Sequence, residues 1–316
     1  MVDSDGRNFS NGYLAGDEVK LWGQSDLAAF VALCQVGFDQ ESLSEDDLEL
    51  CLPRAEDAPN VVLGPADGMA CAALRMTGGQ AQLELLVTHP TRRRQGLARL
   101  LLLAAEDWAR AHGASSLAIG GRAPVGLFSG VDLRWTAAIS LIASMGYQSQ
   151  GTATDLVCST IQGARVASPA GVEVARVETD EQLDAVLEFV ALHAPLQLEV
   201  VSIAARAGTA VFAQSPRGRG ICCVAVHSIY RLGVIGPVVF AVAPDSTDPA
   251  LTLSREHGGL LAAVLGLIRS DLAVAGLRTV EVLGEFSVAD YVVACQASTR
   301  RVSAVFCADL EKPREE

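Results

Sequence analysis

The stretch that decides the fold of this chain runs from residue 87 to residue 100 and reads Val-Thr-His-Pro-Thr-Arg-Arg-Arg-Gln-Gly-Leu-Ala-Arg-Leu. It predicts a strand that ends near Val87, a short basic turn, and a long helix that begins around Gln95. The first N–H groups of a helix have no partner inside the helix, so this end already carries partial positive charge. Three arginines at such a position, Arg92, Arg93 and Arg94, raise the electrostatic energy unless an anion lies against them. The pattern therefore indicates a site for a phosphate-bearing ligand.

The composition excludes several classes of function. With 316 residues the chain has room for about two domains, and its net charge is −13. A strongly acidic chain lacks the basic face that general nucleic-acid binding needs. No apolar run reaches the roughly 20 residues of a membrane helix, and the polar residues 1–16 lack the pattern of a signal peptide. We therefore expect a cytoplasmic monomer or homodimer without nucleic-acid or membrane partners.

The cysteines and histidines predict neither disulfides nor a metal site. None of the eight cysteines forms a C-x-x-C pair, and most stand in apolar surroundings. This usage is typical of reduced, buried thiols in a cytoplasmic protein. The five histidines are scattered, so a zinc site would lack ligands. We expect no metal.

The order of predicted elements repeats along the chain. Each half reads as a strand, helices, antiparallel strands, a long helix, a strand, a short helix and a last strand. The predicted last strands are residues 154–158 for the first half and 302–310 for the second. We expect a flexible tail over 1–16, a first domain over 17–162 and a second over 171–312. The predicted class is α/β, with a mixed, mostly antiparallel sheet flanked by helices in each domain.

The basic turn carries a resemblance to a known family. Arg93-Arg94-Gln95-Gly96-Leu97-Ala98 is similar to the acyl-CoA signature Gln/Arg-x-x-Gly-x-Gly/Ala of the GCN5-related N-acetyltransferases (GNATs). The context also matches, because the signature follows a strand and opens a long helix, and Gly146-Tyr147 resembles the family's glycine–aromatic ending. The resemblance covers roughly residues 19–158 and implies a GNAT fold with acetyl-CoA as co-substrate. The alternative is a solvated basic turn that merely starts a helix.

The resemblance also implies where the cofactor lies. The pantetheine arm would run between two diverging parallel strands and pair with the backbone near Leu86 and Val87. The pyrophosphate would rest on backbone N–H groups from Arg94 to Arg99, where Gly96 permits close approach. The expected cofactor-binding residues are Leu86, Val87, Arg92, Arg93, Arg94, Gln95, Gly96, Leu97, Ala98 and Arg99.

The second half resembles the family more faintly. Arg255-Glu256-His257-Gly258-Gly259-Leu260 takes the equivalent place, but it ends in leucine and follows an acidic segment with Asp245 and Asp248. A branched side chain and nearby carboxylates oppose phosphate binding. We therefore expect a tandem GNAT chain with an active first domain and a degenerate second domain.

The family's reaction, attack of an amine on a thioester, implies a general base. Glu84 is the candidate, because it is a charged residue inside the apolar strand 83–87. Strand alternation predicts Glu84 and Leu86 on one side and Leu85 and Val87 on the other. The alternative is that Glu84 is a solvated outward residue.

Two further roles are less well defined by the sequence. The tyrosine that often serves as general acid in the family would stand at Ile142 and is absent, which leaves water or another residue, and Tyr147 is assigned to packing. The loop 120–130 is a candidate lid. We expect Phe128, Asp132, Arg134 and Trp135 to line the acceptor pocket.

The sequence thus predicts an acetyl-CoA-dependent N-acetyltransferase that acts on the amine of a small molecule. Two alternatives stay open. The chain is a catalytically idle acyl-CoA-binding or regulatory protein, or it acetylates a protein or peptide, in which case its acidic surface favours basic partners.

Overall fold

The structure is a computed structural model that divides into two compact units. It describes residues 19–38, 41, 43, 45–49, 51, 60–77, 79–120, 128–160, 172–214, 220–227, 233–240, 249–284 and 295–311. The described residues of unit 1 fall within Met1–Gly121, Gly126–Thr152 and Ala304–Glu316. Those of unit 2 fall within Ala153–Ser303. No helix in the described part of the chain has both the length and the apolar character needed to cross a membrane.

Unit 1 is built around a six-stranded sheet in which β4 and β5 are the parallel neighbours. The strand order is β1-β2-β3-β4-β5-β13. In chain order its elements are β1 (Val19–Trp22), α1 (Leu27–Gly37), α2 (Glu45–Glu49), β2 (Asn60–Pro65), β3 (Ala70–Thr77), β4 (Gln80–Thr88), α3 (Leu97–Ala111), β5 (Ser116–Ile119), β6 (Val131–Asp132), α4 (Thr136–Ser144) and the end of β13 (Ser298–Asp309).

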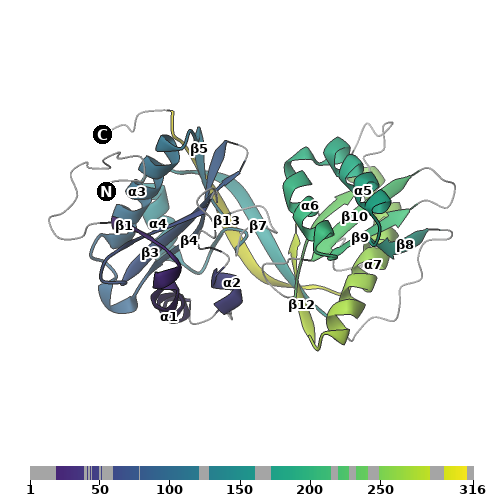
Figure 1. Cartoon of the computed structure of the whole chain (residues 1–316), viewed down its shortest axis with the longest axis horizontal. Coiled ribbons are helices and arrows are strands. Elements are labelled where there is room, and N and C mark those ends of the chain that lie inside the picture. The colour runs from purple at the N-terminus through teal and green to yellow at the C-terminus, as the bar shows by residue number, and fades with distance from the viewer. Residues whose placement is uncertain are drawn as a thin grey trace. The chain divides into compact units, whose positions relative to one another are not determined.

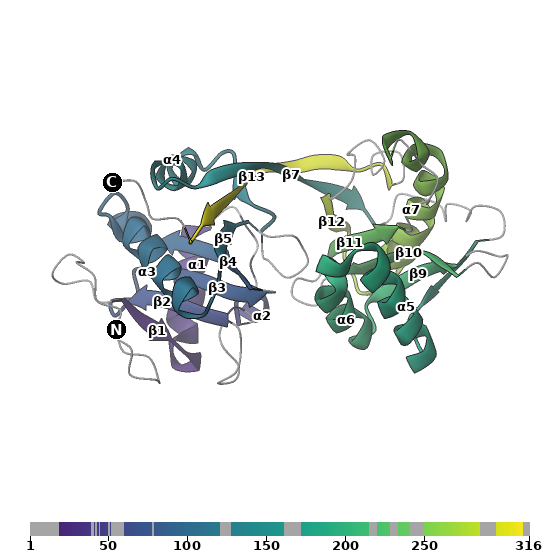
Figure 2. The same ribbon diagram turned by 90° about the horizontal axis from the view of Figure 1, so that it is seen from above.

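Helices cover both faces of the unit 1 sheet (Figures 1 and 2). The apolar stripe of α3, with Leu101 and Ala105 fully buried, packs on one face against Leu83. On the other face, α1 contributes Phe30 and Cys34 to a second cluster, in which the α2 residue Leu48 also lies. Each large aliphatic or aromatic side chain buried in this way contributes about 1.5–3 kcal/mol. The sheet is therefore anchored from both sides around β3 and β4.

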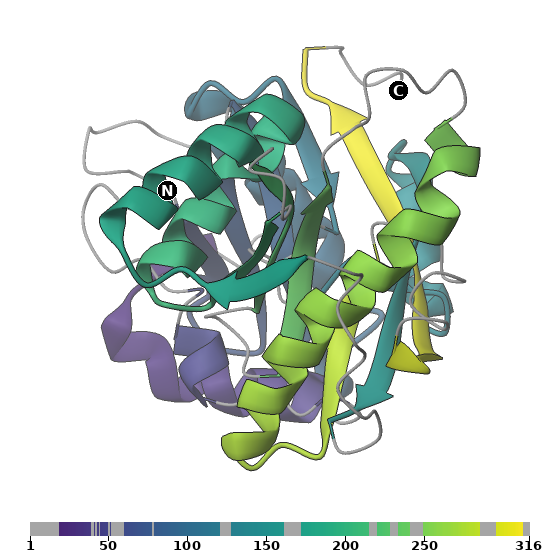
Figure 3. The ribbon, with the colours of Figure 1, turned by 90° about the vertical axis from the view of Figure 1, so that its right-hand side faces the viewer.

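Unit 2 has the same plan. The strand order is β7-β12-β11-β10-β9-β8, with β11 and β12 parallel. Its long helix α7 packs on one face, and α5 and α6 cover the other (Figure 3). In chain order the elements are β7 (Gln148–Ser159), β8 (Glu173–Arg176), α5 (Asp180–His193), α6 (Leu198–Arg206), β9 (Ala210–Gln214), β10 (Ile221–His227), β11 (Val234–Phe240), α7 (Pro249–Val274), β12 (Thr279–Gly284) and the start of β13. The predicted α/β class and the mostly antiparallel sheets are confirmed.

The last strand of each unit differs from the sequence prediction. In unit 1, β5 pairs with the end of β13, where Phe306 lies opposite Ile119 and Asp309 opposite Ser116. In unit 2, β12 pairs with the second half of β7, from Thr279 opposite Ser159 to Gly284 opposite Thr154. Residues 154–158 therefore complete unit 2 rather than the first domain, and residues 304–309 complete unit 1. The units consequently divide the chain differently from the expected domains over 17–162 and 171–312.

Contacts around Leu310 hold the end of β13 in unit 1. We call this end of β13 the exchanged strand, because it completes unit 1 although it follows unit 2 in the sequence. The Leu310 N–H donates to the Ser115 carbonyl at 2.9 Å. Arg110 Nε donates to the Leu310 carbonyl at 3.3 Å, across 200 residues of sequence. Phe306 and Leu310 are 5% and 6% exposed and belong to the same cluster as α3. The end of β13 is therefore an integral part of the unit 1 core.

Candidate active site

The signature loop ends in an uncapped helix terminus. Gly96 is the N-cap of α3 with φ 85°, and no side chain caps this end of the helix. The helix begins at Leu97, two residues later than predicted. A Cβ built on Gly96 would meet no atom within 4 Å, so the space beside it is open. The N–H groups of the first turn are therefore presented at an open, glycine-lined position, which is the arrangement that binds anions.

The loop also contains a strained non-glycine residue. Arg94 has φ 64°, a left-handed conformation that costs an L-residue about 1–2 kcal/mol. Left-handed residues in a turn direct successive backbone N–H groups into a shallow concavity suited to an anion. Such strain is characteristic of functional sites, where the surrounding structure enforces it. The backbone at Arg94 and Gly96 thus supports an anion site at the place that the sequence predicted.

The four arginines of the segment have different roles in the structure. Arg92 pairs with Asp67 at 3.0 Å. Arg93 donates to the main-chain oxygens of Thr88 at 3.3 Å and of Gly37 at 3.4 Å. Arg94 and Arg99 are exposed, and among the described residues neither forms an ion pair. The two arginines that remain available to a ligand are therefore Arg94 and Arg99, rather than the whole run from Arg92 to Arg94.

The strands β4 and β5 form a fork next to this loop. Their parallel pairing runs from Gln80 opposite Ser116 to Leu83 opposite Ile119. Beyond Leu83, β4 continues to Thr88 while β5 has ended, so the described residues offer no β5 partner to Leu86 or Val87. Backbone hydrogen-bonding groups on that side of β4 are thus available to an extended ligand. Both residues that the sequence assigned to the pantetheine arm lie on this open segment.

A β-bulge places Glu84 at the vertex of the fork. Between β3 and β4 the register passes from Leu74 opposite Leu83 to Ala73 opposite Leu85, which leaves Glu84 as the extra residue. A bulge reverses the alternation of side chains beyond it. Leu85 and Val87 therefore join the cluster covered by α1, while Leu86 packs against the α3 cluster.

The predicted alternation at this strand is wrong for that reason. Glu84 contacts Cys51, which belongs to the cluster covered by α1 and α2, so it shares a face with Leu85 and not with Leu86. The alternative of a solvated outward Glu84 is also excluded, because the residue is 8% exposed.

Burial, the Arg75 charge and contacts with Arg75 and Cys51 together affect the ionisation of Glu84. Its Oε1 lies 2.8 Å from Arg75 Nε, and Cys51 Sγ donates to Oε2 at 3.9 Å. Burial is the largest effect and raises the pKa of the carboxyl group, whereas the Arg75 charge and the two contacts lower it. Burial also raises the pKa of the Cys51 thiol. A carboxyl group with a raised pKa in a buried bulge has the properties of a general base.

Sequence reasoning missed Arg75 and Cys51. Arg75 is a charged residue within the apolar strand β3, which is the same signal that singled out Glu84 one strand later. Arg75 was therefore detectable from the sequence. Cys51 lies between a short helix and a stretch outside the described residues, and no pattern in the sequence places it beside Glu84.

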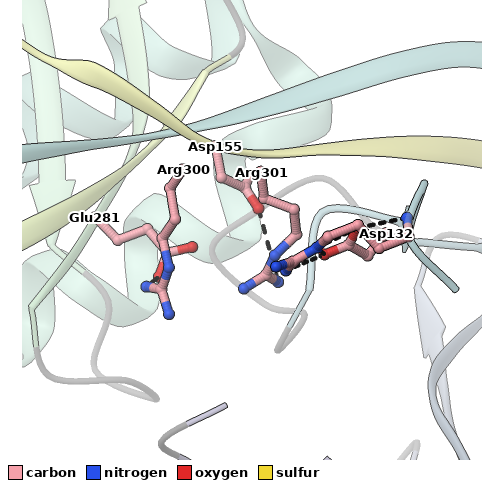
Figure 4. A network of polar contacts seen from close by, with 6 residues as sticks. Asp132, Asp155, Glu281, Arg300 and Arg301 are labelled. Atoms are coloured by element: carbon pink, nitrogen blue, oxygen red, sulfur yellow. Dashed lines mark hydrogen bonds and ion pairs between the residues drawn. The ribbon is translucent and has the colours of Figure 1, made fainter. Parts of the chain in front are cut away.

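The predicted acceptor residues form two groups. Phe128 and Trp135 pack with Phe38 in an aromatic trio, with ring centroids 5.3–5.7 Å apart. Asp132 is 1% exposed and accepts hydrogen bonds from the Arg134 side chain and from the Arg134 N–H at 2.8 Å (Figure 4). The structure therefore brings Phe128 and Trp135 together at the end of α1. Asp132 and Arg134 form hydrogen bonds with each other. Residues 121–127 of the expected lid lie outside the described residues.

The positions considered for a general acid are occupied by packing residues. Ile142 is 2% exposed and lies in the α3 cluster. Tyr147 is 5% exposed and donates from its hydroxyl to Glu106 Oε1 at 2.8 Å. Its predicted role in packing is confirmed.

Unit 2 has the fork but presents the signature segment differently. Parallel pairing of β11 and β12 covers Val234 opposite Glu281 and Ile235 opposite Val282, and β11 then continues to Phe240. Residues 255–260, the counterpart of the signature, lie inside α7, which begins at Pro249. Asp245 and Asp248 lie outside the described residues.

A group of charged residues also occupies the strands around β12. Asp155 and Arg301 are each 1% exposed and lie 3.9 Å apart, and Glu281 accepts a hydrogen bond from Arg300 (Figure 4). Asp155, Glu281 and Arg301 are buried in unit 2, and β5, the strand of unit 1 equivalent to β12, has no charged residue in its sequence Ser-Leu-Ala-Ile.

Comparison with known proteins agrees with this geometry. Residues 31–128 match the model of the acetyltransferase (GNAT) family. Among solved structures, a GCN5-related glucosamine N-acetyltransferase region of a fungal multi-domain GH3 β-N-acetylglucosaminidase matches with TM-score 0.74 and 17% identity. That match covers 94% of this chain but only 38% of the fungal chain. No curated protein matches the sequence.

Two further structures match along nearly their whole length. A GCN5-related N-acetyltransferase from Sphaerobacter thermophilus has TM-score 0.69 and 15% identity, with 93% of this chain and 95% of that chain covered. A tandem GNAT protein from the clavulanic acid biosynthesis pathway has TM-score 0.64 and 18% identity, with 94% and 99% covered. These likenesses show the fold of both units.

The fork of parallel strands and the glycine loop that opens α3 are the two features that unit 1 places next to each other. The chain has the tandem GNAT fold, and residues 31–128 of unit 1 match the model of the GNAT family. Members of this family typically use acyl-CoA. The residues present fit such a co-substrate, because the open helix terminus, the space beside Gly96 and the free cations of Arg94 and Arg99 all suit its phosphates.

Proposed function

We propose that unit 1 transfers the acetyl group of acetyl-CoA to the amine of a small molecule. The observation that carries this proposal is a coincidence in space along one strand. The end of β4–β5 pairing at Leu83, the bulged acid Glu84 and the uncapped start of α3 all lie within one strand–loop–helix segment. This supports a linear site in which phosphates, thioester and amine would follow one another along β4.

The binding part of the proposal uses the chain's own donors. The N–H groups of Leu97, Ala98 and Arg99 would hold the pyrophosphate, with charge supplied by Arg94 and Arg99. The backbone of Leu86 and Val87 would pair with the pantetheine amides. Arg92 would stabilise the loop through its hydrogen bond to Asp67. Arg93 would do so through its hydrogen bonds to the carbonyls of Thr88 and Gly37.

The chemical step requires one proton acceptor and one polarising donor. Glu84 would take a proton from the acceptor ammonium, and the free amine would then attack the thioester carbon. A C–N bond forms, the C–S bond breaks, the attacking nitrogen loses its second proton to water, and the departing CoA thiolate takes a proton from water. A backbone N–H near Val87 would stabilise the negative charge on the carbonyl oxygen. The position of the expected acid tyrosine is occupied by the buried Ile142, which has no proton to donate. The thiolate would therefore take its proton from water.

We propose that unit 2 does not bind acetyl-CoA. N–H groups inside a helix donate to carbonyls four residues earlier, so the segment 255–260 within α7 has none to offer a phosphate. This supports one active unit in a tandem chain.

A matched pair of glycine substitutions tests the cofactor site. Gly96 and Gly113 have φ 85° and 80°, and a Cβ at either would meet nothing within 4 Å. Gly96→Leu and Gly113→Leu therefore introduce the same backbone strain at opposite ends of α3. We expect isothermal titration with acetyl-CoA to show loss of binding for Gly96→Leu alone, with Gly258→Leu in α7 also binding as the wild type. Equal loss in Gly96→Leu and Gly258→Leu would overturn the assignment to unit 1.

A panel of amines tests the reaction. We expect release of free CoA thiol from acetyl-CoA in the presence of small primary amines, and loss of that release in Glu84→Gln. Turnover with basic peptides alone would assign the chain to peptide acetylation. Tight acetyl-CoA binding without turnover across the panel would identify an idle acyl-CoA-binding protein.

A further inference from the structure

The buried ion pair of Arg75 and Glu84 is part of the unit 1 site. Arg75 and Glu84 are each 8% exposed, and Arg75 Nε lies 2.8 Å from Glu84 Oε1. The pair lies on the sheet face covered by α1 and α2, next to the vertex of the fork. The desolvation free energy needed to bury two charges can exceed the free energy that their attraction gains. A buried ion pair is therefore weak evidence of a purely stabilising role.

The register explains why these two residues meet. Arg75 lies directly opposite Gln82, and Glu84 is two residues further along β4 on the same face. The bulge then adds Leu85 to that face, which places an apolar side chain beside the carboxylate. The sheet thus fixes the Arg75 guanidinium next to one oxygen of Glu84 from a neighbouring strand.

The titratable groups around Glu84 come from three directions. Arg75 and Cys71 belong to β3, Cys34 belongs to α1, and Cys51 follows α2. Helix α1 has no charged residue in its sequence LAAFVALCQVG. Burial raises the pKa of Glu84, and Arg75 is the strongest influence that lowers it. Within the described residues, Arg75 is therefore the only cation identified as acting on this carboxyl group.

The two oxygens of Glu84 have different surroundings. Among the described residues, Oε1 faces the Arg75 guanidinium, whereas the one donor to Oε2 is the weakly donating Cys51 thiol at 3.9 Å. A carboxylate can take a proton from an amine only when it is ionised, and its less strongly held oxygen is the more basic one. Oε2 is therefore the oxygen suited to accept a proton.

We propose that Arg75 is a positioning residue for acetyl transfer: its guanidinium keeps Glu84 ionised and holds Oε1, so that Oε2 receives the proton of the acceptor amine. This inference rests on the proposed function in its catalytic part. It also makes a claim about the ionisation of Glu84 that is measurable without any acceptor.

The first test is a direct titration of the carboxyl group in the full chain. Carbon-13 NMR of side-chain carboxyls follows the ionisation of glutamates, and the signal missing from Glu84→Gln identifies Glu84. We expect Arg75→Met to raise the titration midpoint of Glu84 by about one to three pH units, because a neighbouring opposite charge is removed. Arg75→Lys keeps the charge and is expected to retain most of the wild-type midpoint.

Controls make the titration decisive. Arg176→Met removes an ion-paired arginine from unit 2 and is expected to leave the Glu84 midpoint unchanged. Arg75→Gln keeps a hydrogen-bond donor beside Glu84 without a charge, and it serves if Arg75→Met does not fold. An unchanged midpoint in a folded Arg75→Met or Arg75→Gln chain would overturn the proposal.

The second test uses the amines that the panel identifies. We expect the acidic limb of the pH profile of kcat to move upward in Arg75→Gln by the same amount as the titration midpoint, with KM for acetyl-CoA unchanged. Raising the pH should then restore kcat, which a loss of structure would not allow. If no amine is acetylated, the proposed function fails while the titration still decides the role of Arg75. If the acidic limb of the kcat profile does not move while the titration midpoint of Glu84 does, the proton-accepting role of Glu84 is wrong.

Discussion

The two units share a fork of parallel strands followed by a helix, and they differ in where that helix begins. In unit 1 the left-handed turn at Gly96 delays α3 until Leu97, so the first N–H groups face open space. In unit 2 the helix α7 begins at Pro249 and includes Gly258 and Gly259. The comparison shows that glycines at equivalent places in the sequence do not by themselves delay the start of a helix. The backbone must also leave the helix at that place, because only unpaired N–H groups can bind a phosphate.

The units also differ in how they bury charge. Unit 1 places one acid, Glu84, at the bulge beside the open segment of β4, with Arg75 as its partner. Unit 2 places Asp155, Arg301 and Glu281 on the strands around β12, with Arg300 partly exposed beside them. The strands next to the fork of unit 1 thus carry one buried ion pair, whereas the strands around β12 in unit 2 carry a larger group of charges.

The largest effect is expected from removal of the exchanged strand. A chain that ends at Ser303 lacks Phe306 and Leu310, whose loss alone costs more than about 5 kcal/mol. Since typical domains are stable by about 5–15 kcal/mol, unit 1 should unfold although the removed residues come from the end of the chain. All three tryptophans, Trp22, Trp108 and Trp135, lie in unit 1, so tryptophan fluorescence reports on this unit.

A chain that ends at Glu311 keeps all of β13 and is the control for this truncation. Native tryptophan emission in the Ser303 chain would contradict the exchange of strands.

Two helical glycines are expected to respond with opposite signs. A Cβ on Gly37, at the end of α1, would lie 2.1 Å from Val87 Cγ2, whereas one on Gly266 in α7 meets nothing within 4 Å. Gly37→Ala should destabilise unit 1 by about 1–3 kcal/mol through overpacking and displace the strand residue Val87. Gly266→Ala should stabilise unit 2 by about 0.5–1 kcal/mol.

Differential scanning calorimetry together with tryptophan fluorescence separates the two units in this experiment. A fall in acetyl-CoA affinity should accompany Gly37→Ala and not Gly266→Ala. Equal changes in both variants would show that α1 does not pack against β4 as described.

The stability of unit 1 should depend on the ionisation of Glu84. Burial raises the pKa of Glu84 above its ordinary value of 4.5, so the folded state binds this proton more tightly than the unfolded state. The wild type therefore loses stability as the pH rises from 4.5 through the raised pKa, whereas Glu84→Gln does not titrate. Urea denaturation followed by tryptophan fluorescence between pH 4 and pH 8 should show the difference between them shifting in favour of the variant. Parallel stability curves would contradict the raised pKa.

The smallest effect is expected at an exposed ion pair of unit 2. Arg176 on β8 pairs with Asp271 on α7, with side chains 41% and 34% exposed. Asp271→Asn should cost at most about 1 kcal/mol, and added salt should reduce the cost further, because water and ions screen such pairs. Calorimetry at low and at high salt measures this. A cost that is large and independent of salt would place this pair in the same class as the buried pair of unit 1.

The sequence predicted the structural features that residues close together in the sequence determine. The strand predicted to end near Val87 ends at Thr88, and the long helix predicted to begin around Gln95 begins at Leu97. The signature could be located because its residues are contiguous and their spacing has a physical reason. Glu84, a charged residue in an apolar strand, was visible for the same reason.

The sequence could not predict what distant pairing determines. Strand 154–158 has the same composition whether it pairs with β5 or with β12, and only the tertiary structure decides between them. The bulge at Glu84 likewise depends on the register against β3, and it overturned the alternation expected for Leu86. Arg75 lies opposite Gln82 through that register, so its contact with Glu84 is a property of the sheet rather than of any motif.

The exchange of last strands has a consequence for synthesis on the ribosome. Residues 19–152 leave the ribosome early, yet β5 cannot receive its neighbour until residues 304–309 have been made. During that interval β5 is an open edge, which is the kind of surface that associates with other chains. A product of interrupted translation would therefore contain every residue of the signature loop without a finished unit around it. If unit 1 binds acetyl-CoA as proposed, we expect only chains translated through residue 309 to acquire it.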